Sequence, residues 1–77
     1  MSLSFDIELD TCGLNCPLPI LKAKKSLMTM QPGQVLKIMS TDPGAQRDFQ
    51  AFAKQTGNDL LLQETDGDKF SIWLKRR

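Results

Sequence analysis

Apolar and polar residues follow regular spacings in the first half of the chain. Over residues 5–10, apolar side chains alternate strictly with carboxylates, which predicts a strand with Phe5 on its buried face. Over residues 16–30 the apolar positions recur at helical spacing, and Pro32-Gly33 ends that pattern. Pro17 suits the first position of this helix, where its missing N–H is no loss. The residues expected to face the core from the helix are Ile20, Ala23, Leu27 and Met30.

The second half of the chain carries the same two kinds of pattern. Residues 34–41 are rich in aliphatic side chains, which predicts a second strand. Asp42-Pro43 predicts a helix start with Asp42 as the N-cap, and Gly57 ends that helix. Leucines at 60–62 mark a third strand, and Asp66-Gly67 is typical of a hairpin turn before a fourth. The positions expected to face the core are Ala45, Phe49, Phe52, Ala53, Phe70, Ile72 and Leu74.

The predicted element order is β-α-β-α-β-β, in one domain that spans residues 1–77. The first two strands should be parallel because a helix joins them, whereas the last two form a hairpin. The apolar stripes of both helices should pack against the same face of the sheet. We therefore expect an α+β fold, a two-layer sandwich of a mixed four-stranded sheet with two helices on one face. Trp73 is out of phase with its strand's core positions, so it should point to the open face as a surface aromatic or a partner contact.

Composition narrows the class of protein. The chain has 77 residues and is 40% hydrophobic, which indicates a globular domain with a thin core and no deep cavity for a large cofactor. A net charge of +1 is no argument for or against a nucleic-acid partner. The first ten residues lack the basic and apolar regions of a secretory signal, and no apolar run is long enough to span a membrane. We therefore expect a cytoplasmic protein with reduced thiols.

Positive charge gathers at two places, residues 75–77 and a cluster of Lys22, Lys24 and Lys25 downstream of Cys16. A solvated helix face and a solubilising tail account for both. The alternative interpretation is a cationic rim, in which the three lysines help to ionise the Cys16 thiol and attract an acidic partner.

Cys16 is the candidate reactive residue, because the chain has no histidine or tyrosine to act as a nucleophile or base near neutral pH. As the N-cap of the first helix, its sulfur would accept the N–H of Leu18, and the positive helix end would favour the thiolate. Pro17 and Pro19 would stiffen this turn, and Gly13 allows the preceding loop an unusual backbone angle. We predict a partly exposed, easily ionised thiol; the alternative is a passive cap or core cysteine.

The composition of the chain and the spacing of its two cysteines exclude several kinds of thiol chemistry. A cysteine hydrolase needs a histidine base, and a zinc site needs about four ligands from Cys, His or carboxylate. Cys12 and Cys16 are separated by three residues, instead of the two of thioredoxin-type motifs. Chemistry that needs only a thiolate remains, either carrying a group or exchanging with another sulfur. Cys12 is then an inert strand-end residue or a resolving thiol for Cys16.

The segment around Cys16 carries a family resemblance. Leu9-Asp10 followed by Gly13-Leu14-Asn15-Cys16-Pro17-Leu18-Pro19 resembles the TusA/SirA-like sulfurtransferase family. Pro32-Gly33, Asp42-Pro43 and the closing hairpin lie where that family has them, so the resemblance extends from Leu9 to Leu74.

The resemblance implies the same fold and a specific activity. In that family, the cysteine matching Cys16 takes sulfane sulfur from a cysteine desulfurase or related donor protein, holds it as a persulfide and passes it to an acceptor protein. Its branches serve tRNA thiolation, molybdenum-cofactor synthesis and other sulfur pathways, and the carrier needs no cofactor or metal and no direct nucleic-acid contact. The tRNA-thiolation branch has arginine and glutamate where Asn15 and Leu18 stand here, which leaves the acceptor open.

Two other functions remain as alternatives. One is a non-covalent regulatory or RNA-binding module that uses the open sheet face and basic ends; its binding would depend on salt and survive Cys16→Ser. The other is a redox sensor in which Cys12 and Cys16 form a reversible disulfide, and this response would require Cys12.

Overall fold

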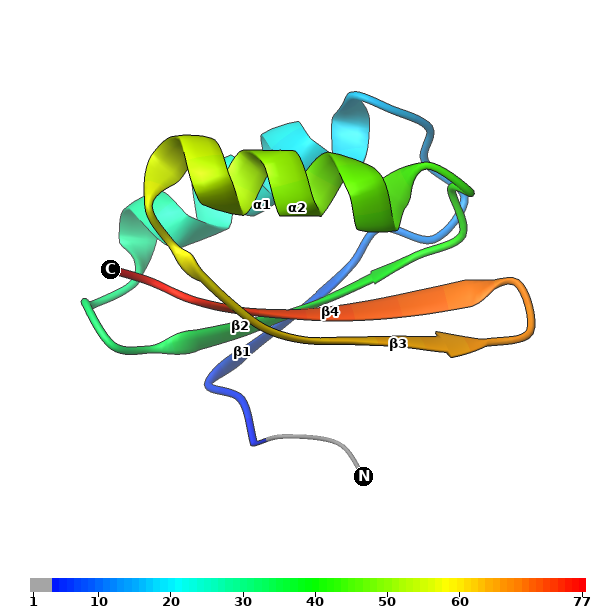
Figure 1. The fold of residues 1–77 in the computed structure, drawn as a ribbon. Coiled ribbons are helices and arrows are strands. Elements are labelled where there is room, and N and C mark those ends of the chain that lie inside the picture. The colour runs from blue at the N-terminus through cyan, green and yellow to red at the C-terminus, as the bar shows by residue number, and fades with distance from the viewer. Residues whose placement is uncertain (1–3) are drawn as a thin grey trace.

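The computed structural model describes residues 4–77 and contains the six predicted elements in the predicted order (Figure 1). Neither helix among these residues is long and apolar enough to cross a membrane. The elements are β1 (Ile7–Asp10), α1 (Leu18–Thr29), β2 (Val35–Ser40), α2 (Ala45–Thr56), β3 (Asp59–Asp66) and β4 (Lys69–Lys75).

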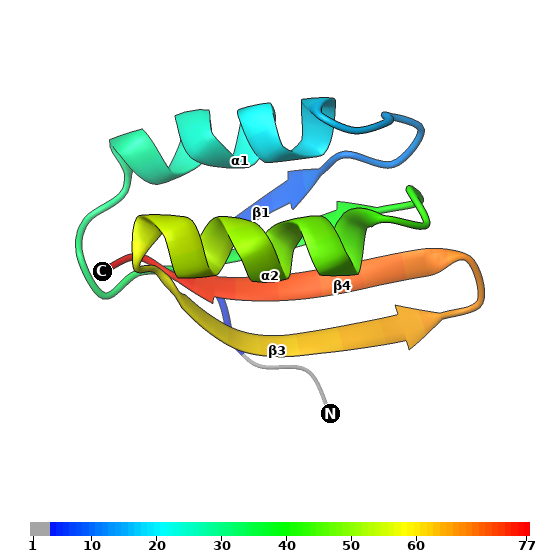
Figure 2. The same ribbon diagram turned by 45° about the horizontal axis from the view of Figure 1, so that its top comes forward.

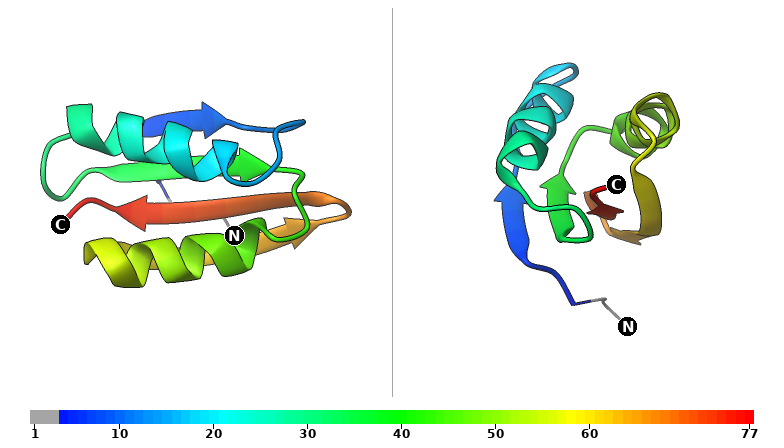
Figure 3. Two further views of the ribbon diagram at one scale, coloured as in Figure 1. Left: turned by 90° about the horizontal axis from the view of Figure 1, so that it is seen from above. Right: turned by 90° about the vertical axis from the view of Figure 1, so that its left-hand side faces the viewer.

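The four strands form one mixed sheet in the order β1-β2-β4-β3 (Figure 2). β1 runs parallel to β2, while β4 is antiparallel to both of its neighbours, β2 and β3. Both helices lie side by side over the same face of this sheet (Figure 3). The predicted α+β sandwich, with two helices on one face of a mixed four-stranded sheet, is therefore confirmed.

The core fills the space between the helices and the sheet, as the apolar spacings predict. Helix α2 buries all four predicted positions; α1 buries Ala23 and Leu27, Met30 is buried just after its end, and Ile20 is half-buried. Phe49 is fully buried and packs edge-to-face on Phe52, with ring centroids 6.1 Å apart. The strands contribute Leu36, Ile38, Ile72 and Leu74, all with 0% exposure, and half-buried Phe70.

Several predicted boundaries are wrong by a few residues. Helix α1 begins at Leu18 instead of Cys16, and α2 begins at Ala45 instead of Pro43, after a turn in which the Ala45 N–H donates to the carbonyl of Asp42. The hairpin turn consists of residues 67–68, one position later than predicted, and the paired residues Asp66 and Lys69 flank it. Gly67 has a φ of +63°.

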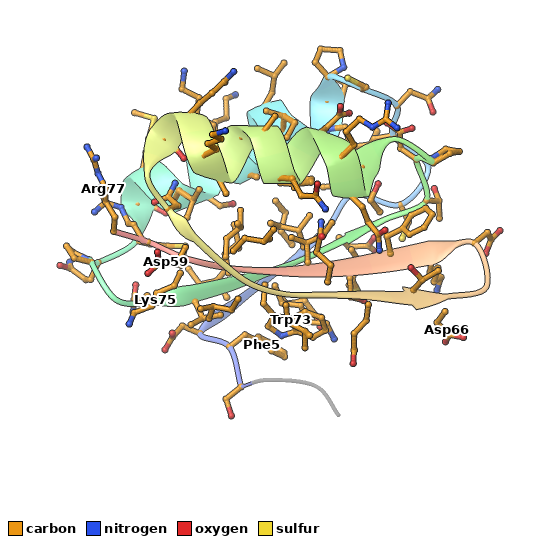
Figure 4. The ribbon with its side chains drawn as sticks, in the orientation of Figure 1. Phe5, Asp59, Asp66, Trp73, Lys75 and Arg77 are labelled. Carbon is orange, nitrogen blue, oxygen red and sulfur yellow. The ribbon has the colours of Figure 1, made fainter. Side chains whose placement is uncertain are left out.

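Trp73 points away from the helices, as predicted, but it is not a surface residue (Figure 4). Its exposed fraction is 0%. The Lys37 Nζ lies 5.4 Å from the centre of the Trp73 ring and 5.3 Å from that of Phe5, and it also pairs with Glu8 at 3.7 Å. Phe5 lies before β1 and joins this cluster on the open face, so its predicted place on the core face is wrong.

Candidate functional site

Cys16 lies in the loop between β1 and α1, beyond the carboxyl end of β1. The loop between β2 and α2 reaches the same end of the sheet, because β1 and β2 are parallel and both lead into helices on one face (Figure 2). The Cys16 side chain is exposed, so a reactive group on another protein has access to it. The predicted exposure of this thiol is thus confirmed.

Hydrogen bonds to the neighbouring chain segment position the Cys16 loop. Thr11 donates its N–H to the carbonyl of Met39 at 2.8 Å, and Gly13 donates to the Thr41 hydroxyl at 2.8 Å. Gly13 takes φ +85°, the unusual backbone angle that the sequence suggested, and a side chain there would strain the loop. The Cys16 N–H in turn donates to Asp42 Oδ2 at 2.9 Å. The loop is therefore held to β2 and to the segment that follows it.

The predicted capping role of the Cys16 sulfur is wrong. Pro17 occupies the N-cap position of α1, and the Leu18 N–H donates to the carbonyl of Asn15 at 2.9 Å, so it is not free for the sulfur. The peptide bond between Cys16 and Pro17 is cis. Pro19 is buried, whereas Pro17 and Leu18 are exposed beside the cysteine.

Carboxylates, not cations, set the electrostatics of the thiol. The pKa of Cys16 is raised, first by a hydrogen bond to the Asp48 carboxylate, then by partial desolvation and by the negative charges of Asp48 and Asp42. The prediction that this thiol ionises easily is therefore wrong. Asp48 lies in the first turn of α2, a place that favours an acid because of the helix dipole.

The three lysines of α1 are exposed, and none contributes to the pKa of Cys16. The alternative interpretation, in which these lysines help to ionise the thiol, is therefore wrong. They lie instead on the outer surface of α1, around a shallow hollow together with the exposed apolar residues Leu18, Leu21 and Met28.

Cys12 occupies the same loop but a different environment. It is half-buried, and its N–H donates to Asp10 Oδ1 at 2.9 Å. Burial raises the pKa of its thiol, and a hydrogen bond to Asp10 adds to the effect. Both cysteines are free thiols in this structure.

Asp42 joins the Cys16 loop to the start of α2, because its two oxygens accept the N–H groups of Cys16 and Gly44. Asp42→Ala removes both acceptors, and we expect it to lower the free energy of unfolding by about 1–2 kcal/mol. Urea denaturation followed by circular dichroism measures this change. Asp66→Ala, at the exposed hairpin, is the control and should stay within about 0.5 kcal/mol. Equal effects of the two substitutions would contradict the linking role.

The chain is similar to known proteins over nearly its whole length. The family model described as sulfurtransferase TusA matches residues 7–76. The sulfur carrier protein TusA of Allochromatium vinosum is 58% identical over 72 residues, which cover 94% of this chain and 95% of that protein. The putative sulfur carrier protein YrkI of Bacillus subtilis is 41% identical, over 92% of this chain and 95% of its own.

A solved structure has the same fold. The crystal structure of a SirA-like protein from Desulfitobacterium hafniense aligns with a TM-score of 0.79 at 24% identity, over 91% of this chain and 96% of that one. This structure shows the shared fold, whereas the family model and the curated relatives show the family. The chain belongs to the TusA sulfurtransferase family.

Proposed function

We propose that the protein carries sulfane sulfur as a persulfide on Cys16, taking it from a cysteine desulfurase or related donor protein and passing it to an acceptor protein. The observation that carries this proposal is the position of Cys16: an exposed thiol on a tethered loop, inside the Cys-Pro-Leu-Pro segment of a TusA-family chain. The A. vinosum relative, named a sulfur carrier protein, and the B. subtilis relative, named a putative one, support it.

The transfer chemistry requires only sulfur atoms. The Cys16 thiolate attacks the terminal sulfur of the donor persulfide; the new Sγ–S bond forms while the donor S–S bond breaks, and the electron pair leaves on the donor cysteine. An acceptor thiolate then attacks the terminal sulfur on Cys16 in the same way, and Cys16 leaves as the thiolate. Each step exchanges one S–S bond for another, so no external oxidant or cofactor is consumed.

The exposed outer face of α1 is the proposed docking surface for these partners. Lys22, Lys24 and Lys25 surround exposed Leu18 and Leu21 there, and this combination suits a partner with an apolar contact bordered by acidic residues. Pro17, Pro19 and Gly13 support the loop that presents the sulfur. The proposal places the carrier in the cytoplasm, in tRNA thiolation, molybdenum-cofactor synthesis or another sulfur pathway, without direct contact to nucleic acid.

A load-and-chase experiment tests the proposal. The reduced protein is incubated with a cysteine desulfurase and cysteine carrying radioactive sulfur, re-isolated, and mixed with an excess of a small acceptor thiol. We expect the label to remain on the protein during isolation and to move to the thiol during the chase. Label that never becomes attached with several desulfurases, or that stays attached through the chase, contradicts a carrier function.

A further inference from the structure

The loop that carries the thiol leaves the sheet beside the connection between β2 and α2 (Figure 2). Two side chains of this connection accept backbone N–H groups of the loop. The Gly13 N–H donates to the Thr41 hydroxyl at 2.8 Å. The Cys16 N–H donates to Asp42 Oδ2 at 2.9 Å. Two consecutive residues that follow β2 therefore hold the loop at two points, and the second point is the backbone of the nucleophile itself.

Asp42 is itself held to the sheet. Its N–H donates to Ser40 Oγ at 3.1 Å, and its carbonyl accepts the N–H of Ala45 at 2.9 Å. The second oxygen of its carboxylate accepts the Gly44 N–H at 3.1 Å. Ser40 is fully buried at the end of β2, a strand that pairs on both sides, with β1 and β4. A chain of hydrogen bonds therefore runs from a central strand, through Asp42, to the backbone of Cys16.

The proposed docking surface on α1 begins directly after this loop. Leu18 is the first residue of the helix, two positions after the thiol. The Leu21 N–H donates to the carbonyl of Pro17 at 3.1 Å, so the helical hydrogen bonds start within the loop. Ala23 and Leu27 are buried and fix α1 on the sheet. Thr41 and Asp42, together with this core packing, therefore determine where the exposed sulfur lies relative to the docking surface.

We propose that Thr41 and Asp42 are positioning residues for sulfur transfer, which hold Cys16 Sγ at a fixed place where the persulfide of a docked donor meets it. This inference rests on the proposed function. Neither residue takes part in the bond exchange, in which the Sγ–S bond forms and the donor S–S bond breaks as described above. Reacting atoms must be held close and aligned, and a misplacement of about 1 Å can cost about a hundredfold in rate. A loop without its two acceptors would present the sulfur correctly for only part of the time.

The first test measures single-turnover sulfur transfer to Thr41→Val in a Cys12→Ala background. Valine has nearly the shape of threonine, so the variant removes the acceptor for Gly13 and changes no charge. An excess of persulfide-loaded cysteine desulfurase is mixed with the reduced carrier, and mass spectrometry follows the gain of one sulfur atom. We expect the maximal rate constant to fall about fivefold, the factor for a hydrogen bond of ordinary net strength. The donor concentration at half-maximal rate should not change, because the docking surface is intact.

Two controls separate positioning from other effects. Thr65 is exposed on β3, and its hydroxyl accepts Gln46 Nε2 at 2.8 Å, so Thr65→Val loses a bond of the same length outside the Cys16 loop. This variant should transfer sulfur at the wild-type rate. A small reagent reaches an exposed thiol wherever the loop lies. Alkylation of Thr41→Val by iodoacetamide should therefore match that of the wild type.

The second test uses Asp42→Asn and needs no sulfur donor. An asparagine side chain has one oxygen, so it cannot accept the N–H groups of both Cys16 and Gly44. Amide hydrogen exchange, measured by nuclear magnetic resonance, reports how firmly each N–H is held. We expect exchange at Cys16 to become about fivefold faster in Asp42→Asn, and exchange at Gly13 to do so in Thr41→Val. Asp42→Asn should also lower the maximal transfer rate about fivefold.

Three results would overturn the proposal: a wild-type transfer rate in both Thr41→Val and Asp42→Asn, an equal fall in Thr65→Val, or an equal fall in the alkylation of Thr41→Val. Unchanged amide exchange in both variants would show that the two side chains do not hold the loop. A wild type that takes up no sulfur from several desulfurases refutes the proposed function and, with it, the role in transfer. The hold on the loop is then decided by amide exchange alone, so the two failures are distinguishable.

Discussion

Phe49→Ala is expected to lower the free energy of unfolding by about 3–5 kcal/mol, the range for truncating a buried phenylalanine. Phe49 is fully buried in the layer between α2 and the sheet and contacts the Phe52 ring edge-on. A domain of this size has about 4–12 kcal/mol of total stability, so the variant loses a large part of it. Urea denaturation, followed by circular dichroism, measures the difference.

Phe5→Ala is the matched control for that experiment. Phe5 has the same side chain but is 42% exposed and lies outside the core, beside Lys37 on the open sheet face. We expect its truncation to cost less than about 1 kcal/mol. A larger loss for Phe5→Ala than for Phe49→Ala would contradict the placement of the core on the helical face alone.

Cys16→Ala is expected to abolish sulfur loading by a desulfurase, to the background level, while Cys12→Ala loads like the wild type. The two substitutions each remove one thiol from the same loop, so they form a matched pair. Cys16 is exposed, whereas Cys12 is half-buried and hydrogen-bonded to Asp10. Intact-protein mass spectrometry after incubation with desulfurase and cysteine measures the gain of one sulfur atom in each variant.

The opposite pattern would change the account. Loss of loading in Cys12→Ala alone would make Cys12 the carrier, and loss in both variants would indicate that the two thiols act together, as in the disulfide sensor. A far-ultraviolet circular dichroism spectrum of each variant checks that the fold is unchanged. Cys16→Ala removes an exposed side chain, so its stability should stay within about 0.5 kcal/mol of the wild type.

The architecture could be predicted because the apolar spacings along the chain match the buried positions of the structure. The apolar stripe of α2 and the alternation in β4 each select one face, and two amphipathic helices with one sheet leave few ways to bury those faces. Element starts were less predictable than the buried faces. Asp42 looked like the N-cap of α2, and its Oδ1 does accept the N–H of Gly44, but residues 43 and 44 form a turn and the helix begins at Ala45.

The environment of Cys16 was the part that the sequence did not reveal. A cysteine before a helix suggested an easily ionised thiol, since helix ends favour anions. Asp48 is 32 positions away along the chain, and its effect on the pKa of the thiol depends on two parallel strands whose loops leave the same edge of the sheet. The predicted parallel pairing of the first two strands contained this signal, because it brings the start of the second helix to the loop before the first helix. Trp73 is a similar case, because Lys37 of another strand lies over its ring.

Mapping the added sulfur to a residue tests the central claim most directly. The protein is loaded with a desulfurase, capped with iodoacetamide and digested, and the peptides are sequenced by mass spectrometry. We predict one extra sulfur atom between Cys16 and the cap, removed by prior reduction, with Cys12 capped directly. Extra sulfur on Cys12 instead, or unmodified peptides after loading with several donors, would contradict the claim that Cys16 is the carrier.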